Sequence, residues 1–157
     1  MVTLAVSKTR HFDSPQQAAY LNLWRTYDQL KEVEDGLFSK YDLSAQQYNA
    51  LRLLRSAHPG TMPTLALGGL LISRAPDMTR LLDKLERRQL VHRERRDENR
   101  RVVEVGITQA GLDLLEELAE PVLEVHRQQL GHLDAEELEL LTRLLEKARG
   151  EGPGDRG

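Results

Sequence analysis

Hydrophobic residues recur at intervals of three and four over most of this chain, and this spacing predicts a mainly helical protein. Between residues 91 and 107 the period changes, and Val103, Val105 and Ile107 alternate with other residues as in a half-buried strand. The charged segment 96–100 precedes that strand and has the composition of a turn. The pattern therefore predicts helices with one short β-hairpin inserted among them.

The predicted helices start at six residues that favour a helix N-terminus: Ser14, Ser44, Pro63, Ser73, Thr108 and Asp134. Three of these starts are followed, three residues later, by Gln17, Gln47 or Glu137, which predicts capping boxes. The segment His58-Pro59-Gly60 ends the second helix. In the helix that begins at Ser73, Pro76 lies in the first turn, where its missing N–H costs little.

The helix that begins at Ser73 has one apolar stripe, formed by Ala75, Met78, Leu82 and Leu85. Its basic residues fall mainly outside that stripe. A helix followed directly by a basic hairpin is the arrangement of a winged helix-turn-helix, in which the helix enters the DNA major groove. The hairpin, or wing, then reaches the minor groove or the phosphates. The alternative is a solvated amphipathic helix followed by an ordinary hairpin.

The distribution of charge favours nucleic acid although the total charge of −3 does not. The segment 73–108 holds ten of the 22 Lys and Arg residues and seven acids, and six of the ten basic residues lie between Arg88 and Arg101. From Asp113 to Glu146 there are ten acids against two arginines. A basic middle and an acidic C-terminal third would orient the protein on a polyanion.

The same stretch resembles the MarR family of transcriptional regulators. The matching pieces are TRLLDKLERRQLV (79–91), the wing sequence NRRVVEVGIT (99–108) and the helix start QAG (109–111), and the flanking helices match in length and order. Two positions depart from the family pattern. Asn99 stands two residues before Arg101, where the family usually has Asp, and Gln89 stands in a turn where the family usually has Gly.

The resemblance implies one MarR-type domain over residues 1–157. Its fold is mainly α, a winged helix-turn-helix with a small antiparallel hairpin, flanked by N- and C-terminal dimerisation helices. Residues 14–40 and 109–149 would form those dimerisation helices, residues 44–108 the DNA-binding lobe, and residues 150–157 a flexible tail. A two-fold homodimer implies a palindromic operator with half-sites about one helical turn apart. The alternative is a monomer whose terminal helices cover its own lobe.

The expected contacts to double-stranded DNA are mostly cations of the helix and the wing: Arg74, Asp77, Thr79, Arg80, Lys84, Arg100 and Arg101. Arg74 and Arg80 could make bidentate contacts to guanine, whereas Thr79 and Lys84 suit phosphates. Asp77 could accept from cytosine or could only compensate the helix dipole. The family's wing arginine matches Arg101.

A small-molecule effector is the other expected ligand. MarR-type proteins hold effectors, many of them aromatic acids, between the first helix, the helix after the wing and the DNA-binding lobe. Tyr20, Trp24 and Tyr27 are spaced along the first helix so that they could contribute to such a pocket. A single tryptophan on a helix is more often a core residue, and that alternative stays open.

No constellation for catalysis is evident, so we expect neither an enzyme nor a cofactor. The chain has no cysteine, no two of its five histidines have the i, i+4 spacing of a helical metal site, and no glycine-rich phosphate loop occurs. A metal site built across a dimer stays open. No segment has the length of a membrane span or a signal peptide, which favours a cytoplasmic protein.

The sequence therefore predicts a DNA-binding transcriptional repressor that acts as a homodimer on a palindromic operator and is released by a small effector. The alternatives are a winged-helix module that binds protein instead of DNA, and a small enzyme that uses the pocket between the helices.

Overall fold

The computed structural model describes residues 12–72 and 77–152 of the chain. It contains two compact units that divide within the first helix, after Glu32. Within the described residues, none of the helices combines the length and the apolar character that crossing a membrane requires.

The first unit contains the N-terminal part of α1 (Pro15–Ser39). The predicted start of this helix is confirmed, because Ser14 Oγ accepts a hydrogen bond from the backbone N–H of Gln17 at 3.0 Å. The side chain of Gln17 reaches back to the N–H of Asp13 at 2.6 Å, one residue earlier than a capping box requires. Large apolar side chains of this part of α1 are exposed, among them Tyr20, Trp24 and Tyr27.

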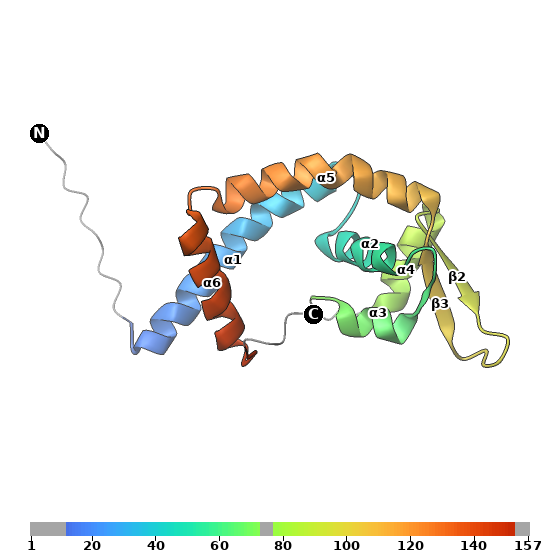
Figure 1. Cartoon of the computed structure of the whole chain (residues 1–157), viewed down its shortest axis with the longest axis horizontal. Coiled ribbons are helices and arrows are strands. Elements are labelled where there is room, and N and C mark those ends of the chain that lie inside the picture. The colour runs from blue at the N-terminus through green and yellow to red at the C-terminus, as the bar shows by residue number, and fades with distance from the viewer. Residues whose placement is uncertain (1–11, 73–76, 153–157) are drawn as a thin grey trace, which may run out of the picture. The chain divides into compact units, whose positions relative to one another are not determined.

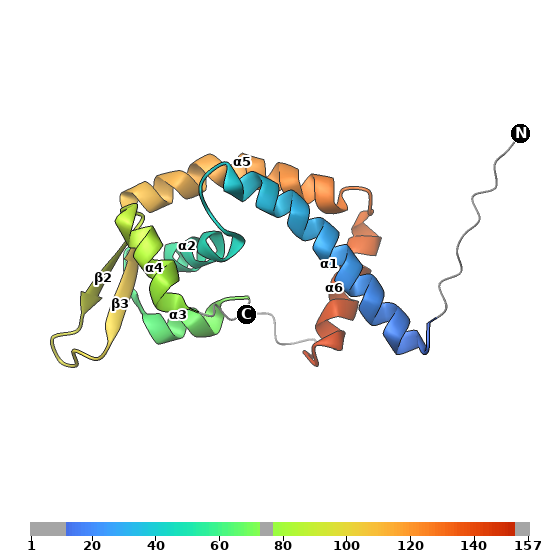
Figure 2. The same ribbon diagram turned by 180° about the vertical axis from the view of Figure 1, so that it is seen from behind.

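The second unit begins at Val33 and holds the other helices, in the order α2 (Ala45–Ala57), α3 (Thr64–Leu70), α4 (Met78–Arg87), α5 (Gln109–Leu130) and α6 (Ala135–Ala148). Both predicted capping boxes in this unit are present, Ser44 with Gln47 on α2 and Asp134 with Glu137 on α6. Thr108 caps α5 by accepting from the N–H of Gly111. Figures 1 and 2 show α2, α3 and α4 grouped beside a small sheet.

The sheet contains β1 (Met62–Pro63), β2 (Val91–Arg95) and β3 (Val103–Ile107), in the spatial order β1-β3-β2, with both pairs antiparallel. The predicted hairpin is confirmed as β2 and β3, whose register pairs Val91 with Ile107 and Arg95 with Val103. The two-residue strand β1 was not predicted. It places β3 at the centre of the sheet, with Met62 opposite Val105.

The expectation of a half-buried β3 was wrong, because both faces of this strand are covered. Glu104, Val105, Gly106 and Ile107 are all buried. A Cβ atom at position 106 would lie 3.0 Å from the side chain of Thr61 and closer still to the ring of His92. Only glycine therefore fits there without displacing a neighbour. The alternation therefore places Val103, Val105 and Ile107 on one face of the strand, and the buried carboxylate of Glu104 and Gly106 on the other.

One core holds the second unit together. Its largest fully buried side chains come from α1, α2, α3, α4, the sheet and α5: Phe38, Leu51, Leu54, Leu67, Leu82, Leu85, Val91, Val105, Leu115 and Leu118. Burying each leucine of this kind stabilises the fold by roughly 1.5–3 kcal/mol. The hairpin and α4 are therefore fixed against the same apolar residues that fix α2 and α5.

Candidate DNA interface

The helix α4 has one buried side and one basic side. Leu81, Leu82 and Leu85 are buried, and of these Leu81 was not among the predicted stripe. The opposite side exposes Arg80, Lys84 and Arg87 at helical spacing, with Thr79 beside them. Of the predicted DNA contacts, Arg80 and Lys84 therefore lie together on one accessible face, and Thr79 is exposed on the neighbouring side of the helix.

The start of α4 differs from the expectation. The helix begins at Met78, and its N-cap is Asp77 rather than Ser73. Asp77 Oδ1 accepts a hydrogen bond from the backbone N–H of Arg80 at 3.0 Å, so the carboxylate satisfies one of the free donors of the first turn. This contact favours the capping role of Asp77 over a contact to cytosine. Ser73, Arg74, Ala75 and Pro76 lie outside the described residues.

The acids of α4 are engaged on the side that faces the wing. Arg93 of β2 donates from Nε to Glu86 Oε2 at 3.2 Å and from Nη2 to Glu86 Oε1 at 3.1 Å. The same Nη2 lies 2.5 Å from Asp83 Oδ1. The hydrogen bonds from Arg93 lower the pKa of Glu86 and those to Glu86 raise the pKa of Arg93. Arg93 therefore joins α4 to β2, and the carboxylates of Asp83 and Glu86 bond to the wing and not to the exposed basic residues of α4.

The tip of the wing is ordered by contacts to its own backbone. Arg95 Nη1 donates to the carbonyl of Arg100 at 2.8 Å, and Asn99 Oδ1 accepts from the N–H of Arg101 at 3.1 Å. The N–H of Arg96 donates to the carbonyl of Val102 at 3.2 Å. These bonds involve only the main chain of Arg100 and Arg101. The two side chains remain exposed, as the predicted DNA contacts require.

The base of the wing is fixed to the helices by polar side chains. The buried carboxylate of Glu104 forms an ion pair with Arg96 and accepts a hydrogen bond from Thr61 Oγ1 at 3.1 Å. Thr64, the first residue of α3, donates from Oγ1 to the carbonyl of Val103 at 3.0 Å. The hairpin is thereby tied to the start of α3 as well as to α4.

Arg87 and Arg88, at the end of α4, have different roles that their charge alone does not distinguish. Arg87 is exposed beside Lys84 and extends the basic side of α4. Arg88 donates from Nη1 to the carbonyl of Asp42 at 2.6 Å and from Nη2 to the carbonyl of Tyr41 at 3.0 Å. It therefore ties the end of α4 to the turn that follows α1. Arg87 could have been found from its spacing, three residues after Lys84 and seven after Arg80.

The turn after α4 contains a strained residue. Gln89 has a φ of 61°, the left-handed region that favours glycine. The N–H of Gln89 donates to the carbonyl of Glu86 and the N–H of Leu90 to that of Leu85, the two bonds of a left-handed helix C-cap. This is the position at which the sequence has Gln in place of the Gly usual in the resembling family.

The candidate effector residues lie in the first unit. Tyr20, Trp24 and Tyr27 are 61%, 59% and 58% exposed, so Trp24 is not a core residue of that unit. The rings of Tyr20 and Trp24 have centroids 6.2 Å apart and are tilted by 51°. These side chains offer an aromatic surface that a ligand or a second protein chain could cover.

Chemistry other than binding finds no support in the described part of the chain. There, no three His, Asp or Glu residues lie close enough together to hold a metal ion. Within residues 12–72 and 77–152, the shifted pKa values of Glu86, Arg93, Arg149 and Glu151 follow mainly from hydrogen-bonded ion pairs.

Comparison with known proteins identifies the family. A profile of the MarR family matches residues 43–103. The chain is 58% identical to a MarR transcription factor from Planctomyces limnophilus, whose crystal structure superposes with a TM-score of 0.70 over 87% of this chain and 98% of that one. It is 32% identical to the HTH-type transcriptional regulator PecS of Dickeya dadantii, over 71% of this chain and 68% of PecS.

The fold is also that of a protein solved on DNA. A cysteine-to-serine mutant of MarR from E. coli, complexed with operator DNA, superposes with a TM-score of 0.72 at 24% identity, over 80% of this chain and 89% of that one. The identity to the Planctomyces protein extends over nearly all of its length, from the terminal helices through the winged lobe. The chain therefore belongs to the MarR family of winged helix-turn-helix, DNA-binding transcriptional regulators, and it is not an enzyme.

Proposed function

We propose that this regulator is a repressor that binds a palindromic operator as a homodimer and is released by a small effector. The observation that carries the proposal is the basic side of α4, where Arg80, Lys84 and Arg87 are exposed while Asp83 and Glu86 are held by Arg93. An exposed row of cations on a helix, with the neighbouring acids bonded elsewhere, suits the major groove and its phosphates. Arg100 and Arg101 at the wing tip would contact the adjacent minor groove.

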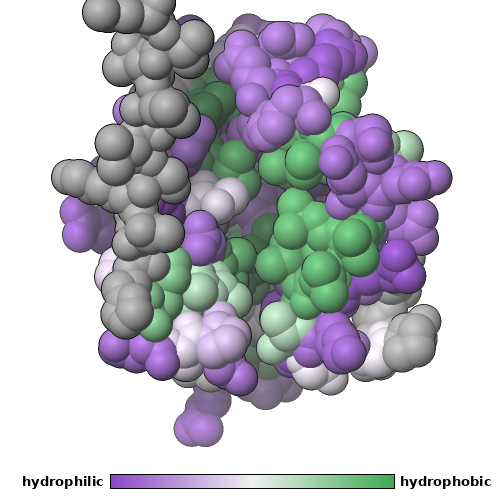
Figure 3. Space-filling model, turned by 90° about the vertical axis from the view of Figure 1, so that its left-hand side faces the viewer, coloured by the Kyte–Doolittle hydropathy of each residue, from purple (hydrophilic) through white to green (hydrophobic). Residues whose placement is uncertain are grey.

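Dimerisation is supported by apolar side chains that the chain itself does not cover. The helix α6 has no buried residue, and it exposes Leu140 and Leu144 at 49% and 55%. Leu123 of α5 is 51% exposed. Hydrophobic residues are also visible at the surface in the space-filling view of Figure 3. Exposed apolar surface of this kind favours association with a second copy of the chain.

The proposal is tested with the DNA upstream of the chain's own gene, by footprinting and by binding at several salt concentrations. We expect a protected palindrome with half-sites about one helical turn apart, bound by a dimer. The affinity should fall steeply with salt, because each neutralised phosphate releases counterions. A strictly monomeric protein that ignores double-stranded DNA in dilute buffer would refute the proposal and leave the protein-binding module as the better interpretation.

The effector is tested through the single tryptophan. If Tyr20, Trp24 and Tyr27 contact an aromatic acid, binding should change the fluorescence of Trp24 and lower the affinity for the operator. The control is Trp24→Phe, which removes the signal but should retain release from DNA. No response to a broad panel of aromatic acids would exclude this class of effector.

A further inference from the structure

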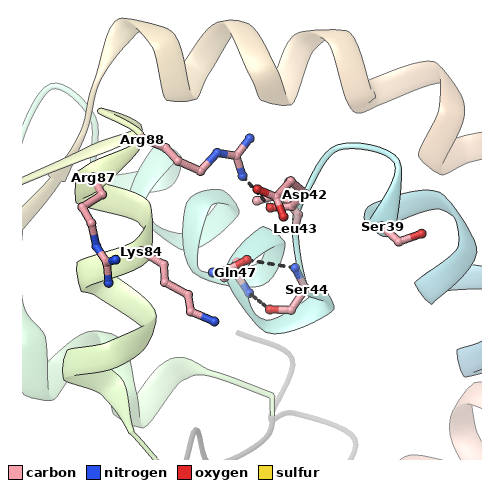
Figure 4. Close-up of a pocket in the computed structure, with 8 residues that line it drawn as sticks. All are labelled: Ser39, Asp42, Leu43, Ser44, Gln47, Lys84, Arg87 and Arg88. Atoms are coloured by element: carbon pink, nitrogen blue, oxygen red, sulfur yellow. Dashed lines mark hydrogen bonds between the residues drawn. The ribbon is translucent and has the colours of Figure 1, made fainter.

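A cavity of about 590 Å³ lies entirely within the second unit, between the end of α4 and the start of α2 (Figure 4). Its walls come from three places: Ser39 and the turn after α1, the first turn of α2, and the basic end of α4. The volume falls in the range of small-molecule sites. The cavity does not include the aromatic residues of α1 considered above as effector contacts.

The charge of this cavity is strongly unbalanced. Lys84, Arg87 and Arg88 line it, and Asp42 is the single acid among the lining residues. Asp77, Asp83 and Glu86 of α4 are not among the lining residues, because Asp77 caps the helix and Asp83 and Glu86 bond to Arg93 of the wing. Within the described residues, no hydrogen bond or ion pair engages the side chains of Lys84 and Arg87. Three cationic residues therefore line one cavity, with one carboxylate among the lining residues.

The guanidinium of Arg88 is fixed at the wall of the cavity. Two of its nitrogens donate to the carbonyls of Asp42 and Tyr41, which hold the guanidinium in place without neutralising its charge. Figure 4 shows Arg88 extended toward Asp42, and Lys84 extended across the cavity toward Ser44 and Gln47. The positive end of the α2 dipole adds to the same field, since Ser44 is the N-cap of that helix.

The lining also indicates the class of ligand. Leu43 is the one hydrophobic residue among the lining residues, and three of the others are cationic, so charge would select the ligand. We propose that the cavity binds a small, flexible anion with two or more carboxylate or phosphate groups, and that this anion competes with the DNA backbone for Lys84. Lys84 lies on the same exposed side of α4 as Arg80, so the two ligands would draw on one cation. The regulatory half of this inference rests on the proposed function.

The binding half is tested without DNA. Sodium citrate is titrated calorimetrically into the full-length protein at constant ionic strength, with inorganic phosphate and sodium salicylate titrated separately. We expect saturable binding of one citrate per chain, weaker binding of phosphate and little binding of salicylate in this cavity. The double variant Lys84→Gln, Arg87→Gln should weaken citrate binding at least tenfold. The matched control Arg52→Gln, Arg55→Gln removes two exposed charges of α2 outside the cavity and should leave it unchanged.

Citrate binding that is absent, or equal in the two double variants, would overturn the site. Because Lys84 and Arg87 are exposed, their loss should not unfold the protein, and circular dichroism checks this. The regulatory half is tested by the affinity for the operator at fixed ionic strength, which citrate should lower about fivefold or more. If citrate binds but leaves the operator affinity unchanged, the proposed competition between the anion and DNA is wrong. A protein that binds citrate but no duplex would instead overturn the proposed function and leave the site standing.

Discussion

The guanidinium of Arg93, on the first strand of the wing, holds the carboxylate of Glu86, on α4, with two hydrogen bonds of 3.1 and 3.2 Å. This pair joins the two elements that we expect to contact DNA, and Asp83 adds a third acceptor. Planar, bidentate pairing fixes direction as well as distance. The relative position of α4 and β2 is therefore specified by a polar contact at the surface and by apolar contacts beneath it.

Replacing Arg93 should loosen this connection. We expect Arg93→Ala to lower the free energy of unfolding by about 1 kcal/mol, since the pair is only partly shielded from water. Operator affinity should fall further than stability alone explains, because α4 and the wing would lose their fixed orientation. Chemical unfolding and operator binding measure the two effects. The control is Arg127→Ala, which removes an exposed arginine with two exposed acidic partners on α5 and should change neither quantity.

Glu86 should make stability depend on pH. Its pKa lies below the ordinary value of 4.5, chiefly because of the hydrogen bonds from Arg93. The unfolded chain therefore takes up this proton first as the pH falls, so the contribution is complete above about pH 4.5 and is lost as the pH falls through the folded-state pKa. We expect Glu86→Gln to flatten the decline in unfolding free energy below about pH 4.5. Urea unfolding across that range measures it, and an unchanged slope in the variant would contradict the assignment.

Gln89 should be a site of easy stabilisation. Its left-handed backbone costs roughly 1–2 kcal/mol for a residue with a Cβ atom, and glycine avoids this cost. Glycine also loses more conformational entropy on folding, which offsets about half of the stabilisation. We expect Gln89→Gly to raise the free energy of unfolding by roughly 0.5–1 kcal/mol. Gln89→Ala keeps the Cβ atom and serves as the control. Equal stability of the two variants would show that the backbone at position 89 is not strained.

Gly111 and Gly69 should respond to alanine with opposite signs. A Cβ atom at Gly111 would meet the carbonyl oxygen of Leu90 and lie 2.6 Å from Cγ1 of Ile107, whereas one at Gly69 would meet nothing within 4 Å. We expect Gly111→Ala to destabilise the protein by about 1–3 kcal/mol. Gly69→Ala, within α3, should stabilise it by up to about 1 kcal/mol. Thermal unfolding of both variants measures the two effects: the melting temperature should fall for Gly111→Ala and rise for Gly69→Ala.

Arg101 should matter for DNA and not for folding. Its side chain is exposed, and only its backbone N–H contributes to the order of the wing tip, through Asn99. We expect Arg101→Ala to weaken operator binding by roughly 1–3 kcal/mol with an unchanged melting temperature. Arg95→Ala is the informative comparison, because it removes the bond to the carbonyl of Arg100 and should loosen the tip itself. A lower melting temperature for Arg101→Ala would make Arg101 a structural residue.

Local signals predicted the helices and the hairpin well. The capping boxes at Ser44 and Asp134 and the cap at Thr108 occur where the residue spacing predicted them, because each depends on neighbours within three positions. The strand β1 could not be found in this way. It consists of Met62 and Pro63, and its only cause is pairing with β3, about forty residues further along the chain.

The candidate site can be predicted only in part, because the sequence shows that a residue is charged but not which residue it bonds to in the folded chain. Arg80, Lys84 and Arg101 are exposed as expected, whereas Arg93, counted with them, is occupied by Asp83 and Glu86. Arg88 lies next to Arg87 in the sequence, yet its guanidinium donates hydrogen bonds to the carbonyls of Asp42 and Tyr41, which lie 46 and 47 residues earlier. Such pairings depend on tertiary packing and leave no periodic trace in the sequence.

The contrast between the two ends of the hairpin bears on how such regulators diverge. Residues 97–101 are exposed and are held by a few bonds within the wing tip, whereas residues 104–107 are enclosed on both sides. If the tip contacts DNA as we propose, substitutions there should change the preferred DNA without endangering the fold. Substitutions at the enclosed residues 104–107 should instead disturb packing, so the stability of the lobe and the contact to DNA depend on different residues of one hairpin.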